Sequence, residues 1–103
     1  MMAEGINMTR EMLMYERFYH DKAPTHYRLQ YILLTDEVRF GGNTLEVYGA
    51  KIMLYRDGDF VEQKALRGIT PFGTRITAML NAMADGLVTP VGMTDVVTDM
   101  LNT

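Results

Sequence analysis

The stretch "EVYGAKIMLYRDGDFVEQKA", residues 46–65, decides the fold because a tight turn joins two segments in which apolar and polar residues largely alternate. Asp57-Gly58 is a favoured pair for a two-residue hairpin loop, in which both central residues need a positive φ. In that register Arg56 faces Asp59, which forms an opposite-charge pair across the strands. The stretch therefore predicts an antiparallel β-hairpin.

The two faces of this hairpin differ in composition. In the same register Leu54 faces Val61, and Lys51 faces Lys64, a like-charge pair that costs some stability. The face that we expect to point inward carries Tyr48, Ala50, Ile52, Leu54, Val61 and Ala65. The opposite face carries the apolar residues Val47, Met53, Tyr55 and Phe60 beside Lys51, Glu62 and Lys64.

Before the hairpin, "HYRLQYILLT", residues 26–35, reads as another strand. Its apolar residues alternate at first, and then Ile32 and Leu34 make the second face apolar as well. The polar segment "DEVRFGGNT", residues 36–44, is expected to form a turn region around Gly41-Gly42.

The amino-terminal segment favours a helix. Met8, Met12, Tyr15 and Tyr19 follow the spacing i, i+4, i+7 and i+11, which predicts a short helix from about Thr9 to Tyr19. Disorder is the alternative, because the segment has no capping box. We therefore expect residues 1–22 to form a Met-rich tail or short helix, and residues 23–103 to form a single domain.

After the hairpin, "GITPFGTRITAML" (68–80) and "GLVTPVGMTDVVTDML" (86–101) start with similar chemistry. Threonine suits an N-cap and proline suits the first helical position, which indicates two helix starts. Gly86 is expected in the left-handed position that ends the first helix. The capping pairs are Thr70-Pro71 and Thr89-Pro90. The apolar stripes are Phe72, Ile76, Met79, Leu80 and Met83, and then Met93, Val96, Val97, Met100 and Leu101.

Strands grouped before helices favour an α+β fold over a parallel α/β layout. We expect a three-stranded antiparallel meander with two C-terminal helices packed on one face, and an N-terminal helix or tail elsewhere. The length of 103 residues fits one core, and the absence of cysteine excludes disulfides and thiolate chemistry. No apolar run approaches the roughly 20 residues of a membrane span, and charged residues interrupt the amino terminus, so we expect a cytoplasmic protein.

Candidate sites for small ligands and metals are weak. Pro71 and Pro90 each remove an N–H donor that a phosphate-binding loop would need. "HDKAPTH" contains His20, Asp21 and His26, but their spacing across a proline is not a metal-ligand pattern. Asp36-Glu37 and the pair Asp95 and Asp99 are interpreted as solvated, although the latter pair could help to coordinate Mg²⁺. No catalytic residue, cofactor or metal site is predicted.

Nucleic-acid binding is also disfavoured. The net charge is −3, and Arg75 is the only cation from residue 69 to 103, so a helix-turn-helix lacks the charge for DNA phosphates. A sheet-borne platform for RNA could use Tyr27, Tyr31 and Tyr55 with Arg28. Aromatic residues on a sheet are more typical of a core or an interface.

Two stretches resemble a known family. "EVYGAKIML" (46–54) and "VTPVGMTDVVTDML" (88–101) are similar to a family of small proteins of Gram-positive spore-forming anaerobes, a domain of unknown function. The resemblance covers residues 27–101 and rests on Tyr48, Gly49, Pro90, Asp95 and Asp99. It implies a bacterial cytosol and supplies no catalytic residue.

The function that we expect is a non-enzymatic protein-binding module that associates with itself and has a regulatory role. The alternative is a nucleic-acid-binding regulator that uses the C-terminal helix pair or the aromatic sheet face. Two helices can shield only one side of a sheet, so the other side would remain apolar in a monomer. We therefore expect a homodimer that associates through Val47, Met53, Tyr55 and Phe60. The alternative is that the amino-terminal stripe of Met8, Met12, Tyr15 and Tyr19 folds back to cover this side of the sheet.

Overall fold

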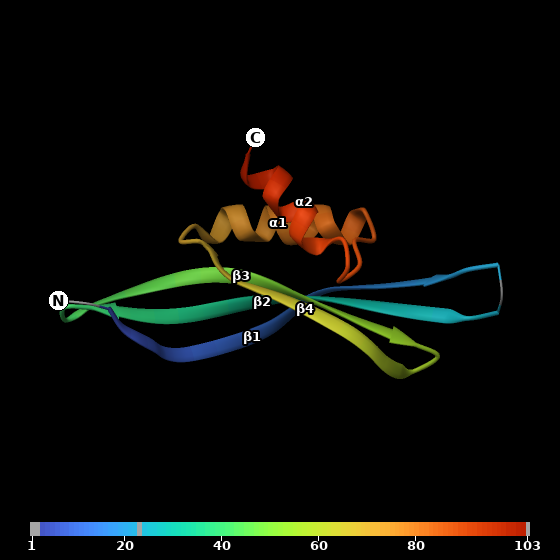
Figure 1. The fold of residues 1–103 in the computed structure, drawn as a ribbon, viewed down its shortest axis with the longest axis horizontal. Helices are drawn as coiled ribbons and strands as arrows, with labels where there is room; N and C mark the ends of the chain where they lie inside the picture. Colours follow the sequence, from blue (N-terminus) through green and yellow to red (C-terminus); the bar gives the residue numbers. More distant parts are fainter. Residues whose placement is uncertain (1–2, 23, 103) are drawn as a thin grey trace.

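The computed structural model describes residues 3–22 and 24–102, which form four strands followed by two helices. The strands are β1 (Ala3–His20), β2 (His26–Phe40), β3 (Asn43–Arg56) and β4 (Asp59–Thr70), and the helices are α1 (Gly73–Asp85) and α2 (Met93–Leu101). The strands form one antiparallel sheet in the order β1-β2-β3-β4, and both helices lie on the same face of it (Figure 1). The predicted α+β fold with two helices on one face is confirmed, but the sheet has four strands and not three.

The additional strand is β1, so the prediction of a helix from Thr9 to Tyr19 is wrong. β1 pairs with β2 along its whole length, from Ala3 opposite Phe40 to His20 opposite His26. A β-bulge explains why its sequence resembles a helix. Met12 lies opposite Leu33 and Tyr15 lies opposite Tyr31, so three residues of β1 span two residues of β2. In a regular strand, residues four apart lie on the same face. The bulge at residue 14 adds one residue to β1, so Met12 and Tyr15, which are three apart, also lie on one face. A bulged strand therefore produces the i, i+4, i+7, i+11 spacing that is typical of a helix.

β2 is longer than the sequence predicted. Asp36 and Glu37, which were expected in a turn, lie inside the strand opposite Val47 and Glu46. The turn itself is confined to Gly41 and Gly42, which both have a positive φ. β2 therefore extends by about five residues into a segment with low apparent strand propensity, because it is paired on both sides.

The hairpin of β3 and β4 is confirmed at its turn and shifted beyond it. Asp57 and Gly58 have φ angles of 49° and 88°, and Arg56 pairs with Asp59 as predicted. A bulge at Val61 then moves the register by one residue. Leu54 consequently lies opposite Glu62 and not opposite Val61.

The shifted register also changes the neighbours of Lys51. This residue lies opposite Ala65, so the predicted contact with Lys64 does not form. Lys64 and Glu62 lie opposite Ile52 and Leu54, on the face that the helices cover, whereas Ala65 moves to the other face. The predicted inward face is therefore correct for β3 and wrong for Val61 and Ala65.

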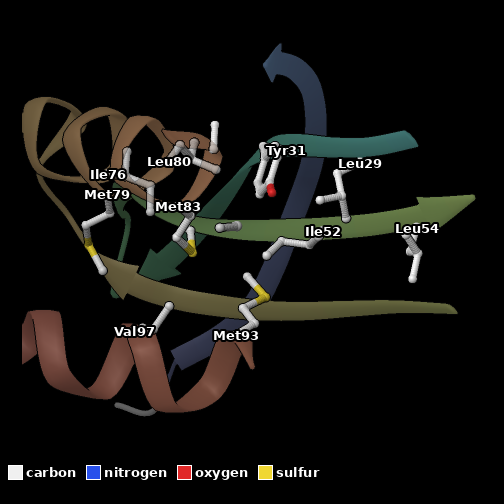
Figure 2. Close-up of a cluster of buried hydrophobic side chains, with 12 residues drawn as sticks. Leu29, Tyr31, Ile52, Leu54, Ile76, Met79, Leu80, Met83, Met93 and Val97 are labelled. Carbon is white, nitrogen blue, oxygen red and sulfur yellow. The ribbon is translucent and has the colours of Figure 1, made fainter. Parts of the chain in front are cut away.

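The core lies between the helices and one face of the sheet (Figure 2). Its buried side chains from the sheet are Leu29, Tyr31, Ala50, Ile52 and Leu54, and those from the helices are Ile76, Met79, Leu80, Met83, Ala84, Met93 and Val97. Two members of the predicted apolar stripes lie outside this core. Phe72 is 63% exposed and Leu101 is 42% exposed, because each lies at the end of its helix.

Both helices begin later than the threonine-proline pairs predicted. α1 begins at Gly73, and the Thr70 hydroxyl instead accepts a hydrogen bond from the Phe72 N–H at 3.2 Å, in the turn before the helix. α2 begins at Met93, with Gly92 as its N-cap. The threonines therefore do not serve as N-caps, since the prolines lie in the preceding turns.

The C-terminus of α1 also differs from the prediction. Gly86 has a φ of −87°, whereas Leu87 has a φ of 52° and occupies the left-handed position. The Leu87 N–H donates to Ala84 O, and the Val88 N–H donates to Met83 O. These two bonds form a Schellman motif in which a leucine replaces the usual glycine.

Candidate interaction surface on the open face

The sheet face opposite the helices, called the open face below, carries a continuous row of large side chains. Phe18 lies opposite Arg28, Arg28 lies opposite Tyr55, and Tyr55 lies opposite Phe60, so the row crosses all four strands. These residues point away from the helices because the alternate residue Leu29 points into the core. We call these four residues the cross-strand row.

Three side chains of the cross-strand row, those of Arg28, Tyr55 and Phe60, contact one another. The guanidinium carbon of Arg28 lies 4.2 Å from the centre of the Tyr55 ring, and the Tyr55 and Phe60 rings meet edge to face with centroids 6.0 Å apart. The Tyr55 hydroxyl also lies 3.8 Å from the Met53 sulfur. Phe18 is nevertheless 71% exposed and Phe60 is 53% exposed. The row is therefore ordered by internal contacts while its two ends remain in water.

Three of the four residues predicted as an interface gather at this row. Met53, Tyr55 and Phe60 lie together on the open face, as the contacts above show. Val47 lies on the same face but six residues from Met53 along β3, which corresponds to about 20 Å in a strand. The structure thus divides the predicted interface residues, and Val47 belongs to a different part of the face.

Val47 lies opposite Asp36, a buried residue at the centre of a polar cluster on the open face. Arg67 donates to both carboxylate oxygens of Asp36, from Nε at 3.1 Å and from a terminal nitrogen at 2.5 Å. The Thr9 hydroxyl donates to Asp36 at 2.9 Å and accepts a bond from Arg67 at 2.9 Å. The Asp36 side chain is only 3% exposed. We call Thr9, Asp36 and Arg67 the Asp36 cluster.

A bulge in β4 allows Arg67 to reach Asp36. Tyr48 pairs with Thr70 and Ala50 pairs with Leu66, so residues 67–69 all lie opposite Gly49. A Cβ atom at Gly49 would lie 2.2 Å from the Leu66 carbonyl oxygen, which shows how closely the two backbones approach. This part of the open face is therefore covered by the chain itself.

Charges on the open face are paired. Each of three cations lies near a carboxylate from a neighbouring strand or across the sheet: Arg28 near Glu16 at 3.7 Å, Lys51 near Glu11 at 2.6 Å, and Arg67 near Asp36. Such a face does not attract a strongly charged partner of either sign, because its own charges are locally balanced.

A shallow groove of about 430 Å³ lies on the opposite side of the molecule, between β1 and α1. Its residues are Tyr15, Gly73, Thr74, Thr77, Ala78 and Asn81. Nearby, Arg10 and Tyr48 both donate to Glu46, at 2.8 and 3.1 Å. The bond from Arg10, followed by that from Tyr48, lowers the pKa of the exposed Glu46 carboxyl. The groove is lined mainly by small side chains of one helix.

The remaining predicted candidates do not assemble into a site. The His20 and His26 rings lie 6.2 Å apart beside the β1–β2 turn, and Asp21 accepts a bond from the Tyr27 hydroxyl at 3.2 Å. Among residues 3–22 and 24–102, no group of three or more His, Cys, Asp or Glu side chains could hold a metal ion. Asp95 and Asp99 are exposed on α2, as expected. No helix in the described part of the chain has the length and hydropathy of a membrane span.

The sheet platform that we considered for RNA is not present in its predicted form. Tyr31 is buried under the helices, and Tyr27 stacks on Tyr19 on the same side, with ring centroids 4.8 Å apart. Tyr55 and Arg28 point to the other face. The sequence did not indicate two residues of the open face: Phe18, whose position depends on β1 being a strand, and Arg67, whose position depends on the bulge in β4.

Comparison with known proteins identifies the family without a function. A family model described as a family of unknown function (DUF6514) matches residues 10–103, a longer stretch than residues 27–101 that carried the resemblance. No curated protein and no solved structure shows significant similarity to the chain. The match includes most of β1 as well as the rest of the sheet and both helices. The chain therefore belongs to the DUF6514 family, a family of unknown function.

Proposed function

We propose that this protein is a non-enzymatic module that associates with a second copy of itself through the cross-strand row, in the cytoplasm of a Gram-positive bacterium. The observation that supports this function is the row itself, in which Phe18 and Phe60 are exposed at the two ends of a line of four side chains across the sheet. Exposed aromatic and methionine side chains beside an arginine have the composition of protein interfaces. A regulatory role would follow from this association.

A second copy is the partner that best fits the charges. Because cations and carboxylates on the open face are paired with one another, the face has no excess of charge that would repel an identical face. A two-fold axis places identical surfaces against each other, which is the commonest arrangement of homo-oligomers. A polyanion such as nucleic acid would instead need an excess of cations.

The sheet edges favour contact through a face. β1 has register shifts between Leu13 and Tyr15 and at two places nearer its start, and β4 has bulges at Val61 and at residues 67–69. Bulges on edge strands disrupt the straight row of N–H and C=O groups that another strand would need. Two copies are therefore expected to meet face to face, not edge to edge.

Sedimentation equilibrium across the micromolar range tests this proposal. We expect a concentration-dependent dimer for the natural sequence and a monomer for the double variant Phe18→Ser/Phe60→Ser. The matched control is Phe72→Ser, because Phe72 is also exposed but lies at the start of α1 on the helix side. Circular dichroism verifies that each variant is folded.

Two results would overturn the proposal. One is a monomer at every concentration, and the other is a double variant that dimerises as well as the natural sequence. A single-stranded oligonucleotide that binds the natural sequence and not the double variant would assign the row to nucleic acid.

A further inference from the structure

Arg28 lies at the centre of the cross-strand row, where its guanidinium group contacts Tyr55 and Glu16. Its guanidinium carbon lies over the Tyr55 ring, 4.2 Å from the ring centre. Glu16 lies 3.7 Å from one terminal nitrogen, and Gln30 in turn donates to the same carboxylate oxygen at 3.0 Å. A cation at this distance over an aromatic ring is in the range of a cation–π contact.

The second face of this guanidinium is directed away from Tyr55. Among the described residues, Tyr55 is the only ring that lies within cation–π range of Arg28. The side chain is 37% exposed, and its neighbour in the row is the exposed Phe18. A planar guanidinium can be stacked on both faces, whereas a lysine ammonium cannot.

We infer that Arg28 determines the specificity of the self-association, because a phenyl ring from the cross-strand row of the second copy stacks on the guanidinium, on the side that faces away from Tyr55. The inference rests on the proposed function. Each guanidinium then lies between its own Tyr55 and a ring of the other copy. The Glu16 carboxylate lies 3.7 Å from one terminal nitrogen of the same guanidinium.

Arg28→Lys tests this inference, because lysine keeps the positive charge and can reach Glu16 but loses the planar stack. We expect the dissociation constant of the dimer to increase about 5- to 900-fold, because the symmetric dimer loses two contacts, each in the range of an exposed to a desolvated cation–π contact. The control is Arg56→Lys, an exposed arginine at the carboxyl end of β3, which should leave the dissociation constant unchanged. The thermal midpoint of the dilute monomer is measured as well, because Arg28→Lys also weakens the contact with Tyr55 within one copy.

A double-mutant cycle identifies the ring that is involved. Arg28→Lys is combined with Phe18→Leu and, separately, with Phe60→Leu, and one of the two pairs is expected to show non-additive loss of dimerisation. If Arg28→Lys does not fold, Arg28→Gln replaces it in the same cycle. Additive losses with both phenylalanines, or an unchanged dissociation constant for Arg28→Lys, would overturn this inference and leave the dimer proposal intact. A natural sequence that remains monomeric would overturn both.

Discussion

Arg67 and Asp36, which lie 31 residues apart in the sequence, form a two-point ion pair on the sheet face that the helices do not cover. The arginine comes from the edge strand β4, and its guanidinium reaches past β3 to a carboxylate on β2 and a hydroxyl, that of Thr9, on β1. One side chain therefore connects three of the four strands directly, and the bulge that carries it covers Gly49 on the remaining strand, β3.

Removal of the arginine should destabilise the fold. Arg67→Met leaves the Asp36 carboxylate, which is 3% exposed, with Thr9 as its remaining side-chain donor among the described residues. Loss of one partner of a fully buried pair costs about 3–5 kcal/mol, and because Arg67 is 41% exposed we expect a smaller loss, about 2 kcal/mol. Urea unfolding measures this difference. Arg75→Met, on the exposed side of α1, is the control, and equal stability of the two variants would contradict the prediction.

Gly49 should not tolerate a side chain. A Cβ atom there would lie 2.2 Å from the Leu66 carbonyl oxygen and 2.8 Å from the Arg67 Cα, both of which are backbone atoms. Gly49→Ala must displace the β4 bulge and is expected to cost about 3 kcal/mol or more. Gly73→Ala is the matched control, because its nearest neighbour would lie 3.9 Å away and alanine favours the helix. Denaturant unfolding measures the free energy of unfolding of both variants. Similar losses of stability would show that the β4 backbone can move away from residue 49.

The sequence predicted the parts of the fold that depend on local chemistry. Asp57-Gly58 placed the β3–β4 turn correctly, and the apolar spacing of Ile76, Leu80 and Met83 placed the buried side of α1. β1 was predicted as a helix because a bulged strand and a helix can share the same spacing of apolar residues. Only the pairing partner, β2, distinguishes the two, and pairing is a long-range property.

The candidate surface could be predicted only in part for the same reason. Met53, Tyr55 and Phe60 follow from the alternation within one hairpin, so their shared face was visible in the sequence. The contribution of Phe18 requires β1 to be a strand. Asp36 was interpreted as solvated because nothing near it in the sequence indicates the arginine that binds it.

Leu87 is a position at which glycine should stabilise the protein. Its φ of 52° is a left-handed conformation that costs a side chain with a Cβ atom about 1–2 kcal/mol, and the residue is 41% exposed. Leu87→Gly relieves this strain, but the greater freedom of glycine in the unfolded chain offsets part of the gain. We expect a net increase of about 0.5–1 kcal/mol in the free energy of unfolding. Leu87→Ala keeps the Cβ atom and should give no increase, so an equal gain from both variants would exclude strain as the cause.

Tyr31 should make the stability of the protein depend on alkaline pH. Its side chain is buried, its hydroxyl donates to Val88 O at 2.8 Å, and burial raises its pKa from 10.0 to about 12. Between these two values the unfolded chain releases the phenolic proton while the folded protein retains it. Each unit by which the pH increases in this window therefore favours the unfolded state. The contribution of Tyr31 to the free energy of unfolding is fully present below pH 10.0 and is lost as the pH rises to about 12.

Tyr31→Phe isolates this contribution, because every other titrating group is common to both proteins. At neutral pH the variant should be less stable by about 1 kcal/mol, since it loses the hydrogen bond to Val88. From pH 10 to pH 12 the difference should shrink and then reverse, because about 1.36 kcal/mol per unit of pKa difference is lost only by the tyrosine form. Urea unfolding of both proteins at several pH values measures the difference. A difference that stays constant through this window would show that Tyr31 ionises as readily in the folded protein as in the unfolded chain.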